Sequence, residues 1–182
     1  MTEATGNDER FGRLYDAHRA ALAAYCRRRV PGDVVDDVMA EVFLSAWRRI
    51  EAIPQGSELP WLYGVARNVV GNQRRSFSRR LRLAVRVVSQ PSDPAPEMAV
   101  TVVAEDQLVL DALVALSESD QELLRLRAWE ELSSAEMAVV LGITASAVDM
   151  RLSRARRRFE RALRSVGFTA RSGARVVKEG LS

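Results

Sequence analysis

Residues 133–159 have the residue types and spacing of a helix-turn-helix that could bind DNA. Ser133 and Glu136 form a capping-box motif that predicts the start of one helix, and Gly142 predicts its end. Thr144 can cap a second helix, which carries several arginines. A short capped helix, a tight turn and a basic second helix place side chains in a major groove, so this stretch predicts recognition of a nucleic acid.

The distribution of charge favours this interpretation. Residues 150–165 contain seven arginines and one acid, whereas residues 93–149 contain twelve acids and two arginines. A chain that needed charge only for solubility would intersperse the two signs. Concentrated positive charge suits the displacement of counterions from phosphates. An ordinary helical hairpin with a solvated arginine face is the alternative for this stretch.

A second basic region lies in the first half of the chain, at residues 59–92. It contains seven arginines and no acid, with Trp61, Tyr63 and Phe77 interleaved. Arginine and aromatic side chains together form a stacking and phosphate-binding surface for single strands. Pro60 predicts the first position of the helix that carries them, and a core position for Trp61 is an equal alternative. The net charge of +3 therefore conceals two basic patches.

Apolar residues at helical spacing predict an all-α fold of two small helical domains joined by a proline-containing linker. A further capping box, Ser119 with Glu122, predicts the helix that precedes residue 133. The first helix has an apolar face made of Phe11, Leu14, Tyr15, Leu22 and Tyr25. The predicted segments are a flexible N-terminus (1–9), a first domain (10–86), a linker (87–106), a second domain (107–165) and a C-terminal tail (166–182).

Several classes of function are disfavoured by the composition. The chain has one cysteine, Cys26, and one histidine, His18, which excludes an internal disulfide and a zinc site of the usual ligands. Nothing pairs with either residue to form a nucleophilic site, so we expect no enzyme, no catalytic residue, no metal and no cofactor. No signal peptide is evident and no apolar run approaches the roughly 20 residues of a membrane span, so we expect a cytoplasmic protein.

Three motifs, taken in order, resemble extracytoplasmic-function (ECF) RNA polymerase sigma factors of the two-domain bacterial type. They are DDVMAEVFLSAW, LPWLYGVARN and LSSAEMAVVLGITASAVDMRLSRARRRF. In that family the first belongs to the segment that binds the polymerase clamp, the second to the promoter-melting segment and the third to the second sigma domain. The resemblance covers roughly residues 11–163, and three ordered motifs with a proline linker between them are highly specific.

For the first domain, the resemblance implies a polymerase contact and a minus-ten DNA site. The implied contacts to the clamp helices of the β′ subunit are Asp37, Glu41 and Phe43. In the family, the loop equivalent to residues 51–59 and the helix after it capture a base flipped from the non-template strand. The implied minus-ten residues are Trp61, Arg67, Asn68, Arg74 and Arg75. The Asn68 amide suits this role because it can both donate and accept toward a base edge.

For the second domain, the resemblance implies contacts to the minus-thirty-five element. The implied residues are Arg127, Ser146, Asp149, Met150, Ser153 and Arg154. Asp149 stands where lysine or arginine is frequent in the family, and Met150 stands where serine is frequent. A carboxylate cannot pair with guanine N7 and O6 but can accept from cytosine N4. We therefore expect this chain to read a different upstream sequence from its relatives.

The function implied by the resemblance is that of a promoter-specificity subunit of RNA polymerase. Its expected partners are core RNA polymerase, through the β′ clamp helices, promoter DNA and a separate anti-sigma protein, with no insertion into a membrane. Two alternatives stay open from the residues alone. One is a stand-alone helix-turn-helix regulator of duplex operators, and the other is an adaptor or anti-sigma-type interaction protein.

Overall fold

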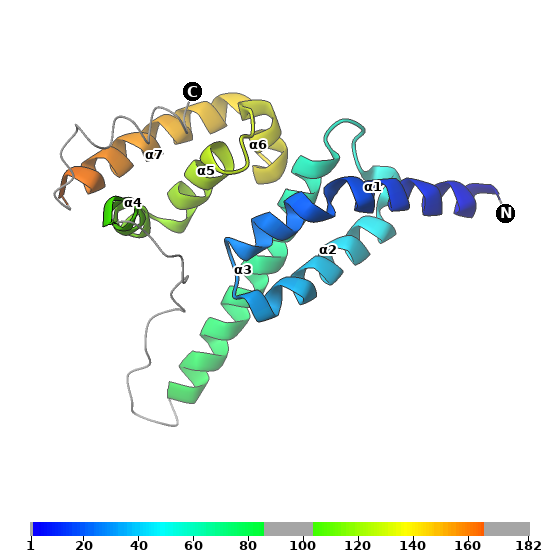
Figure 1. Cartoon of the computed structure of the whole chain (residues 1–182), viewed down its shortest axis with the longest axis horizontal. Helices are drawn as coiled ribbons and strands as arrows, with labels where there is room; N and C mark the ends of the chain where they lie inside the picture. Colours follow the sequence, from blue (N-terminus) through cyan, green and yellow to red (C-terminus); the bar gives the residue numbers. More distant parts are fainter. Residues whose placement is uncertain (1, 86–103, 166–182) are drawn as a thin grey trace. The chain divides into compact units, whose positions relative to one another are not determined.

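A computed structural model of the 182-residue chain describes the backbone of residues 2–85 and 104–165, and side chains within residues 6–75 and 108–165. Every described element is a helix, which confirms the all-α fold (Figure 1). The chain divides into two compact units, residues 1–98 and 99–182. Most of the predicted linker and the whole predicted tail lie outside the described residues. Within the described part of the chain, no helix is both long and apolar enough to span a membrane.

The first unit consists of three long helices, α1 (Thr2–Arg27), α2 (Val35–Arg48) and α3 (Glu58–Val85). Each packs against the other two, and short 3-10 turns at Gly32–Val34 and Ile50–Ala52 connect them (Figure 1). Its core includes side chains with no exposed surface from all three helices, namely Leu22, Tyr25, Cys26, Val38, Val42 and Leu62. The unit is therefore a small helical bundle closed around one apolar core.

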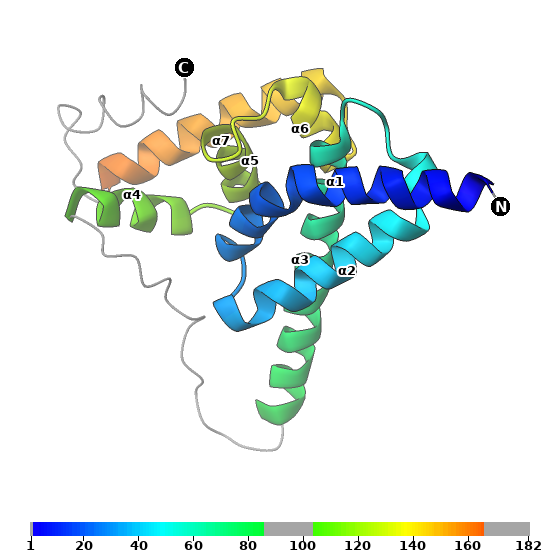
Figure 2. The same ribbon diagram turned by 45° about the vertical axis from the view of Figure 1, so that its right-hand side comes forward.

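The second unit consists of α4 (Ala104–Val114), α5 (Glu118–Ala128), α6 (Ser134–Leu141) and α7 (Ala145–Ser165). Helix α7 contacts each of the other three, as the ribbon in Figure 2 shows. Its inner face buries Val148, Leu152, Ala155 and Leu163. The remaining core residues include Leu126 and Met137, which are fully buried. The arginine-bearing helix is thus also the helix around which the unit packs.

The predicted helix-turn-helix is confirmed at its turns. Ser133 and Glu136 form a complete capping box at the start of α6. Gly142 ends that helix in the left-handed conformation, with φ of 64°, which glycine adopts without steric cost. Thr144 Oγ1 then accepts a hydrogen bond of 3.2 Å from the Ala147 amide and caps α7. The start of α6, its end and the start of α7 are thus each set by a cap that the local sequence encodes.

Residues 2–9, for which the sequence predicts a flexible N-terminus, are helical in the structure, because α1 already begins at Thr2. These residues lack apolar periodicity, so the spacing could not indicate a helix. Polar contacts from α1 to the α2–α3 connection support it instead. Arg10 Nη2 donates to the Ile53 carbonyl at 2.7 Å, and Asn7 Nδ2 donates to Glu51 Oε1 at 3.1 Å. Both contacts join residues more than forty positions apart.

Two predicted helix starts are also displaced. Helix α3 begins at Glu58, so Pro60 is its third residue and not its first. That position still lies in the first turn, where a missing amide hydrogen costs no intrahelical bond. The capping box predicted at Ser119 and Glu122 is wrong, because Ser117 is the N-cap of α5 and accepts from the Asp120 amide at 3.2 Å. Helix α5 accordingly begins at Glu118, two residues earlier than predicted.

Replacing Ser117 with alanine should destabilise α5, because it removes the acceptor for one of the free amides in the first turn. We expect a loss of about 1 kcal/mol, the usual cost of deleting a serine cap. Amide hydrogen exchange across residues 118–128 of the full chain measures the effect locally. Ser119→Ala is the matched control, since its hydroxyl contacts Ser117 but caps nothing. Equal loss in both variants would contradict the assignment of the cap.

Candidate nucleic-acid interface

The first half of α7 presents one continuous exposed stripe. All five residues of this helix that were implied as minus-thirty-five contacts are exposed, namely Ser146, Asp149, Met150, Ser153 and Arg154. Their spacing of three, one, three and one residues places them on a single helical face. Opposite them, Val148 and Leu152 face the core. The structure therefore brings these residues together on the solvent side of α7, which we call the α7 stripe.

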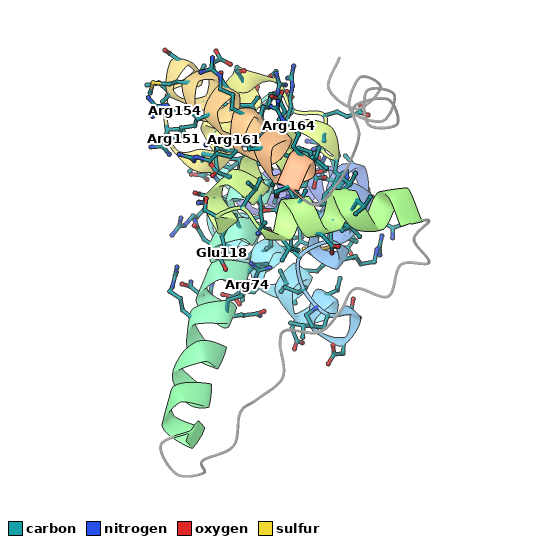
Figure 3. All side chains as sticks on the ribbon, turned by 90° about the vertical axis from the view of Figure 1, so that its left-hand side faces the viewer. Arg74, Glu118, Arg151, Arg154, Arg161 and Arg164 are labelled. Atoms are coloured by element: carbon teal, nitrogen blue, oxygen red, sulfur yellow. The ribbon has the colours of Figure 1, made fainter. Side chains whose placement is uncertain are left out.

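The arginines of α7 divide into different environments. Figure 3 labels Arg151, Arg154, Arg161 and Arg164 along the helix. Arg154 Nη2 donates to Met150 Sδ at 3.4 Å, so these two members of the α7 stripe touch. Arg161 and Arg164 donate to carbonyl oxygens four residues earlier on the same helix, each at 3.3 Å. These are local surface contacts, which a phosphate could replace at small cost.

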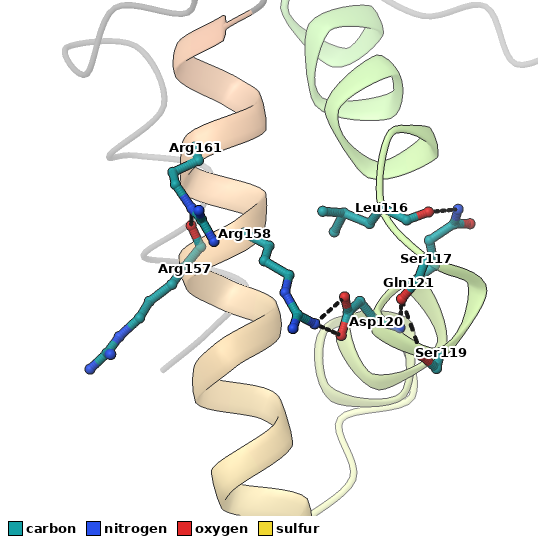
Figure 4. Close-up of polar contacts among 8 residues, drawn as sticks. All are labelled: Leu116, Ser117, Ser119, Asp120, Gln121, Arg157, Arg158 and Arg161. Carbon is teal, nitrogen blue, oxygen red and sulfur yellow. Dashed lines mark hydrogen bonds and ion pairs between the residues drawn. The ribbon is translucent and has the colours of Figure 1, made fainter.

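Arg158 differs from the other arginines of α7, because it forms an ion pair with another helix of the second unit. Its Nη1 donates to both carboxylate oxygens of Asp120 on α5, at 2.7 and 3.0 Å (Figure 4). Asp120 is buried, with 5% of its surface exposed, whereas half of the Arg158 side chain is exposed. Arg157, one residue earlier, points away from Asp120 in the same view. This ion pair joins α5 to α7, and it neutralises a carboxylate that would otherwise be buried alone.

The start of α6 is held by the carboxylate of its own capping box. The Ser133 hydroxyl lies 2.6 Å from Glu136 Oε2, and the Ser133 amide donates to the same oxygen at 2.8 Å. The side-chain hydrogen bond, followed by the backbone one, lowers the pKa of Glu136 below its ordinary value. Glu136 therefore stays ionised in the first turn of α6, where the helix dipole favours a negative charge.

Two of the implied DNA contacts have partners inside the second unit. Asp149 Oδ1 accepts a hydrogen bond of 2.5 Å from the hydroxyl of Ser134, the first residue of α6. Arg127 Nη1 donates to the Leu132 carbonyl at 2.9 Å and so supports the α5–α6 turn. Glu131 in that turn adopts φ of 55°, a conformation unusual for a residue with a side chain. Sequence reasoning missed these partners, because no local motif connects them.

On α2, the implied polymerase contacts differ in exposure. Asp37 and Glu41 are exposed and lie one helical turn apart. Phe43 is only 7% exposed, and its ring packs against Tyr15 and Phe11 at centroid distances of 4.6 and 6.2 Å. Helix α1 therefore covers the Phe43 ring, and the implied contact of Phe43 with the clamp helices stays a prediction. Tyr15, predicted on the apolar face of α1, contacts the rings of Phe11 and Phe43 but remains 41% exposed.

Two apolar residues that sequence reasoning did not select lie on the same side of α2. Leu44 is 48% exposed and Trp47 is 43% exposed. Leu44 lies three residues after Glu41, and Trp47 lies three residues after Leu44. Both therefore continue the helical face of Asp37 and Glu41. Large exposed apolar side chains that adjoin charged ones are typical of a protein-binding surface. We call these four residues, Asp37, Glu41, Leu44 and Trp47, the α2 face.

On α3, the implied minus-ten residues form two adjacent rows along the helix. Arg67 and Arg74 are seven residues apart, as are Asn68 and Arg75, and all four are exposed. Arg74 Nη2 also donates to the Arg29 carbonyl at 2.9 Å, next to the end of α1. Trp61 is half-buried, so its exposure lies between the two alternatives for this residue, a core position and an exposed stacking surface. The side chains of Phe77 and of the later arginines of this helix lie outside the described residues.

No group of three or more potential metal ligands is present among the residues that the structure describes. Cys26 is fully buried between the helices of the first unit. His18 is half-buried on α1. Neither residue therefore forms part of the α7 stripe, the α2 face or the exposed rows of α3.

Comparison with known families matches both units. The family described as Sigma-70 region 2 matches residues 14–80, and the family described as Sigma-70, region 4 matches residues 106–159. These two matches fall on α1–α3 and α4–α7, respectively.

Individual relatives extend over both matched regions. The ECF RNA polymerase sigma factor SigL of Mycobacterium tuberculosis is 33% identical over 162 residues, which cover 86% of this chain and 90% of SigL. The probable RNA polymerase sigma factor RfaY of Xanthomonas campestris is also 33% identical, but the match spans only 40% of that protein. The solved structure of CnrH in complex with the cytosolic domain of CnrY has a TM-score of 0.58 and 29% identity, covering 90% of this chain and 94% of CnrH.

Replacing Arg158 with alanine should loosen α7 from α5, because the buried Asp120 carboxylate loses its partner. We expect a loss of about 2–3 kcal/mol, below the roughly 3–5 kcal/mol of a fully buried pair, since half of Arg158 is solvated. Amide exchange across residues 145–165 of the full chain measures it. Arg157→Ala, which removes a neighbouring charge that points away, should change little. Similar losses in both variants would show that Asp120 does not depend on Arg158.

Proposed function

Because this chain belongs to the extracytoplasmic-function family of RNA polymerase sigma factors, we propose that its α7 stripe reads the minus-thirty-five element and its α2 face binds the polymerase. Members of this family are non-enzymatic initiation subunits that direct RNA polymerase to promoters, and this chain is such a subunit. Membership of this family excludes the two alternative functions that the sequence left open, a stand-alone operator-binding regulator and an adaptor protein.

The observation that carries the proposal is the α7 stripe on a helix fixed from two sides. Base reading needs several side chains on one exposed face of a helix, because that face must enter the groove as a unit. It also needs a rigid support, since a helix free to rotate would present different residues to each base pair. The apolar contacts of Val148 and Leu152 and the Arg158–Asp120 ion pair support α7 in this way.

For the first unit, we propose that the exposed rows of α3 hold the non-template strand of the minus-ten element. Arg67, Arg74 and Arg75 supply positive charge, and Asn68 supplies an amide for a base edge. Residues 51–59 would form the pocket wall for a flipped base. Melting then follows from differential affinity, because the unit must bind the opened strand more tightly than the duplex.

Two further assignments follow from the family. We propose that a separate regulatory protein of the anti-sigma type binds this chain, because CnrH, its 29% identical structural relative, was solved in complex with the cytosolic domain of CnrY. We also propose that the protein acts in the cytoplasm, where its polymerase and promoters are found. Recovery of a partner by affinity capture of the tagged full chain supports the first assignment, and its repeated absence counts against it.

The function is tested by adding the purified full chain to sigma-free core polymerase and sequencing the transcripts that begin on genomic DNA. We expect transcripts from a limited set of start sites that share an upstream and a downstream sequence element. Core polymerase alone should give no such set. If the polymerase neither binds the chain nor gains preferred start sites, the proposed function is wrong.

The α2 face predicts a separable defect in polymerase binding. Glu41→Lys combined with Leu44→Ala should lower the affinity for core polymerase at least tenfold, because one change reverses a charge and the other removes exposed apolar surface. Helicity should be unchanged, since both side chains are solvated. Glu9→Lys, an exposed charge reversal on α1, is the control. Unaltered binding of the double variant in a titration with labelled polymerase would exclude the α2 face as the contact.

Arg154 predicts a defect in DNA reading. Its replacement by alanine should cost about 1–3 kcal/mol on the preferred upstream element if the guanidinium pairs with a base edge. The loss should fall on one base position, so DNA altered at that position should bind both proteins equally. Competition binding of the holoenzyme to a panel of single-base promoter variants measures this. Equal losses across the panel would make Arg154 a phosphate contact.

A further inference from the structure

Asp149 is the one acidic member of the α7 stripe, and its carboxylate is already engaged. Its Oδ1 lies 2.5 Å from the Ser134 hydroxyl, and the two residues are fifteen positions apart on different helices of the helix-turn-helix. A hydrogen bond to an ionised acceptor is stronger and more directional than one between neutral groups. The pair therefore forms a cross-link between the start of α6 and the second turn of α7.

The position of Ser134 adds to this link. Ser134 is the first residue of α6, directly after the capping serine, so its side chain lies at the positive end of the helix dipole. Glu136 occupies the other side of that first turn through its own bonds to Ser133. A carboxylate from α7 is thus held beside a helix end that favours negative charge. Rotation of α7 about its axis would break this contact.

The rest of the α7 stripe is suited to direct reading without Asp149. Met150 is 52% exposed and can contact the methyl group of thymine, while Arg154 can pair with guanine. These two side chains touch each other through the Met150 sulfur. Ser153 lies between them along the helix and is exposed. Three residues with donor, acceptor and apolar surfaces are therefore available at the centre of the stripe.

From this geometry we infer that Asp149 is a positioning residue, which fixes the rotation of α7 through Ser134, and that it does not itself read a base. The inference rests on the proposed role of α7 in the minus-thirty-five groove. It assigns base selection to Met150, Ser153 and Arg154. Ser134, which lies on α6, then affects the base preference of α7 without contacting DNA itself.

The test compares variants of both partners in the holoenzyme on a promoter pool with a randomised upstream element. Ser134→Ala and Asp149→Ala should weaken the preference at the same base positions, each about three- to tenfold, because each removes one net hydrogen bond that orients α7. The double variant should lose no more than the larger single variant. Ser134→Thr keeps the hydroxyl donor, so this variant should retain the base preference of the unaltered chain.

Two further variants separate geometry from charge. Asp149→Asn keeps an oxygen that accepts from Ser134, so the base preference should persist while affinity for all sequences rises as one negative charge is lost. Glu160→Ala, which removes an exposed carboxylate further along α7, is the matched control and should raise affinity without changing preference. If both Asp149 variants alter one base position and Ser134→Ala alters none, Asp149 reads that base and the inference is wrong.

A measurement without DNA distinguishes failure of the link from failure of the function. Amide exchange of the free full chain across residues 134–165 should show non-additive losses of protection for the Ser134→Ala and Asp149→Ala pair. Additive losses would overturn the cross-link whatever the DNA result. Coupling in the free chain together with a holoenzyme that selects no upstream sequence would overturn base selection by α7 and with it the proposed function.

Discussion

The second unit depends on holding one basic helix in a fixed orientation. Helix α7 carries seven arginines, and like charges three or four residues apart on a helix repel one another. Its apolar inner face provides most of the stabilisation through burial of Val148, Leu152 and Leu163. Apolar contacts are non-directional, however, and permit small rotations and slides. The Arg158–Asp120 pair adds direction, because Arg158 Nη1 lies within hydrogen-bond distance of both oxygens of a buried carboxylate, and charge-assisted hydrogen bonds depend on orientation.

In the first unit, too, the inner helix faces form the core and the outer faces carry the exposed charged and apolar residues. The inner faces of α1, α2 and α3 form an apolar core with stacked Tyr25 and Tyr63 rings, whose centroids are 4.6 Å apart. The outer surfaces then differ in character. The α2 face combines acids with Leu44 and Trp47, which suits a protein partner, whereas the exposed rows of α3 carry arginine. A chain with a net charge of only +3 thereby carries separate acidic and basic surfaces.

Much of this structure could be predicted from the sequence, where the determinants are local. The capping box at Ser133, the left-handed Gly142 and the Thr144 cap are each encoded within four residues, and the structure confirms them. The exposure of the α7 stripe follows from helical periodicity alone. Competing local signals were less informative. Ser117 and Ser119 are both of a residue type that caps helices, and the structure shows that Ser117 is the cap.

The features that escaped prediction depend on contacts between distant segments. Nothing local distinguishes Arg158, which pairs with Asp120 thirty-eight residues away, from its neighbour Arg157. The burial of Phe43 depends on the position of α1, and the cross-link of Asp149 depends on the crossing of α6 and α7. Residues 2–9 are helical although they lack apolar spacing, because contacts to the α2–α3 connection support them. Family resemblance indicated where function lies, but it could not indicate which side chains are already engaged.

The most direct measurement places a DNA-cleaving reagent on α7 within the assembled holoenzyme. Cys26 is the only cysteine and is buried, so Ala145→Cys provides a single reactive thiol at the start of α7. An iron chelate on that thiol should cut promoter DNA within the upstream element, because the first turns of a recognition helix approach the bases. The same reagent at Glu160→Cys, on the order of 22 Å along the helix, should cut that element weakly. Cleavage that is absent, or equal from both positions, would contradict the placement of α7 in the upstream groove.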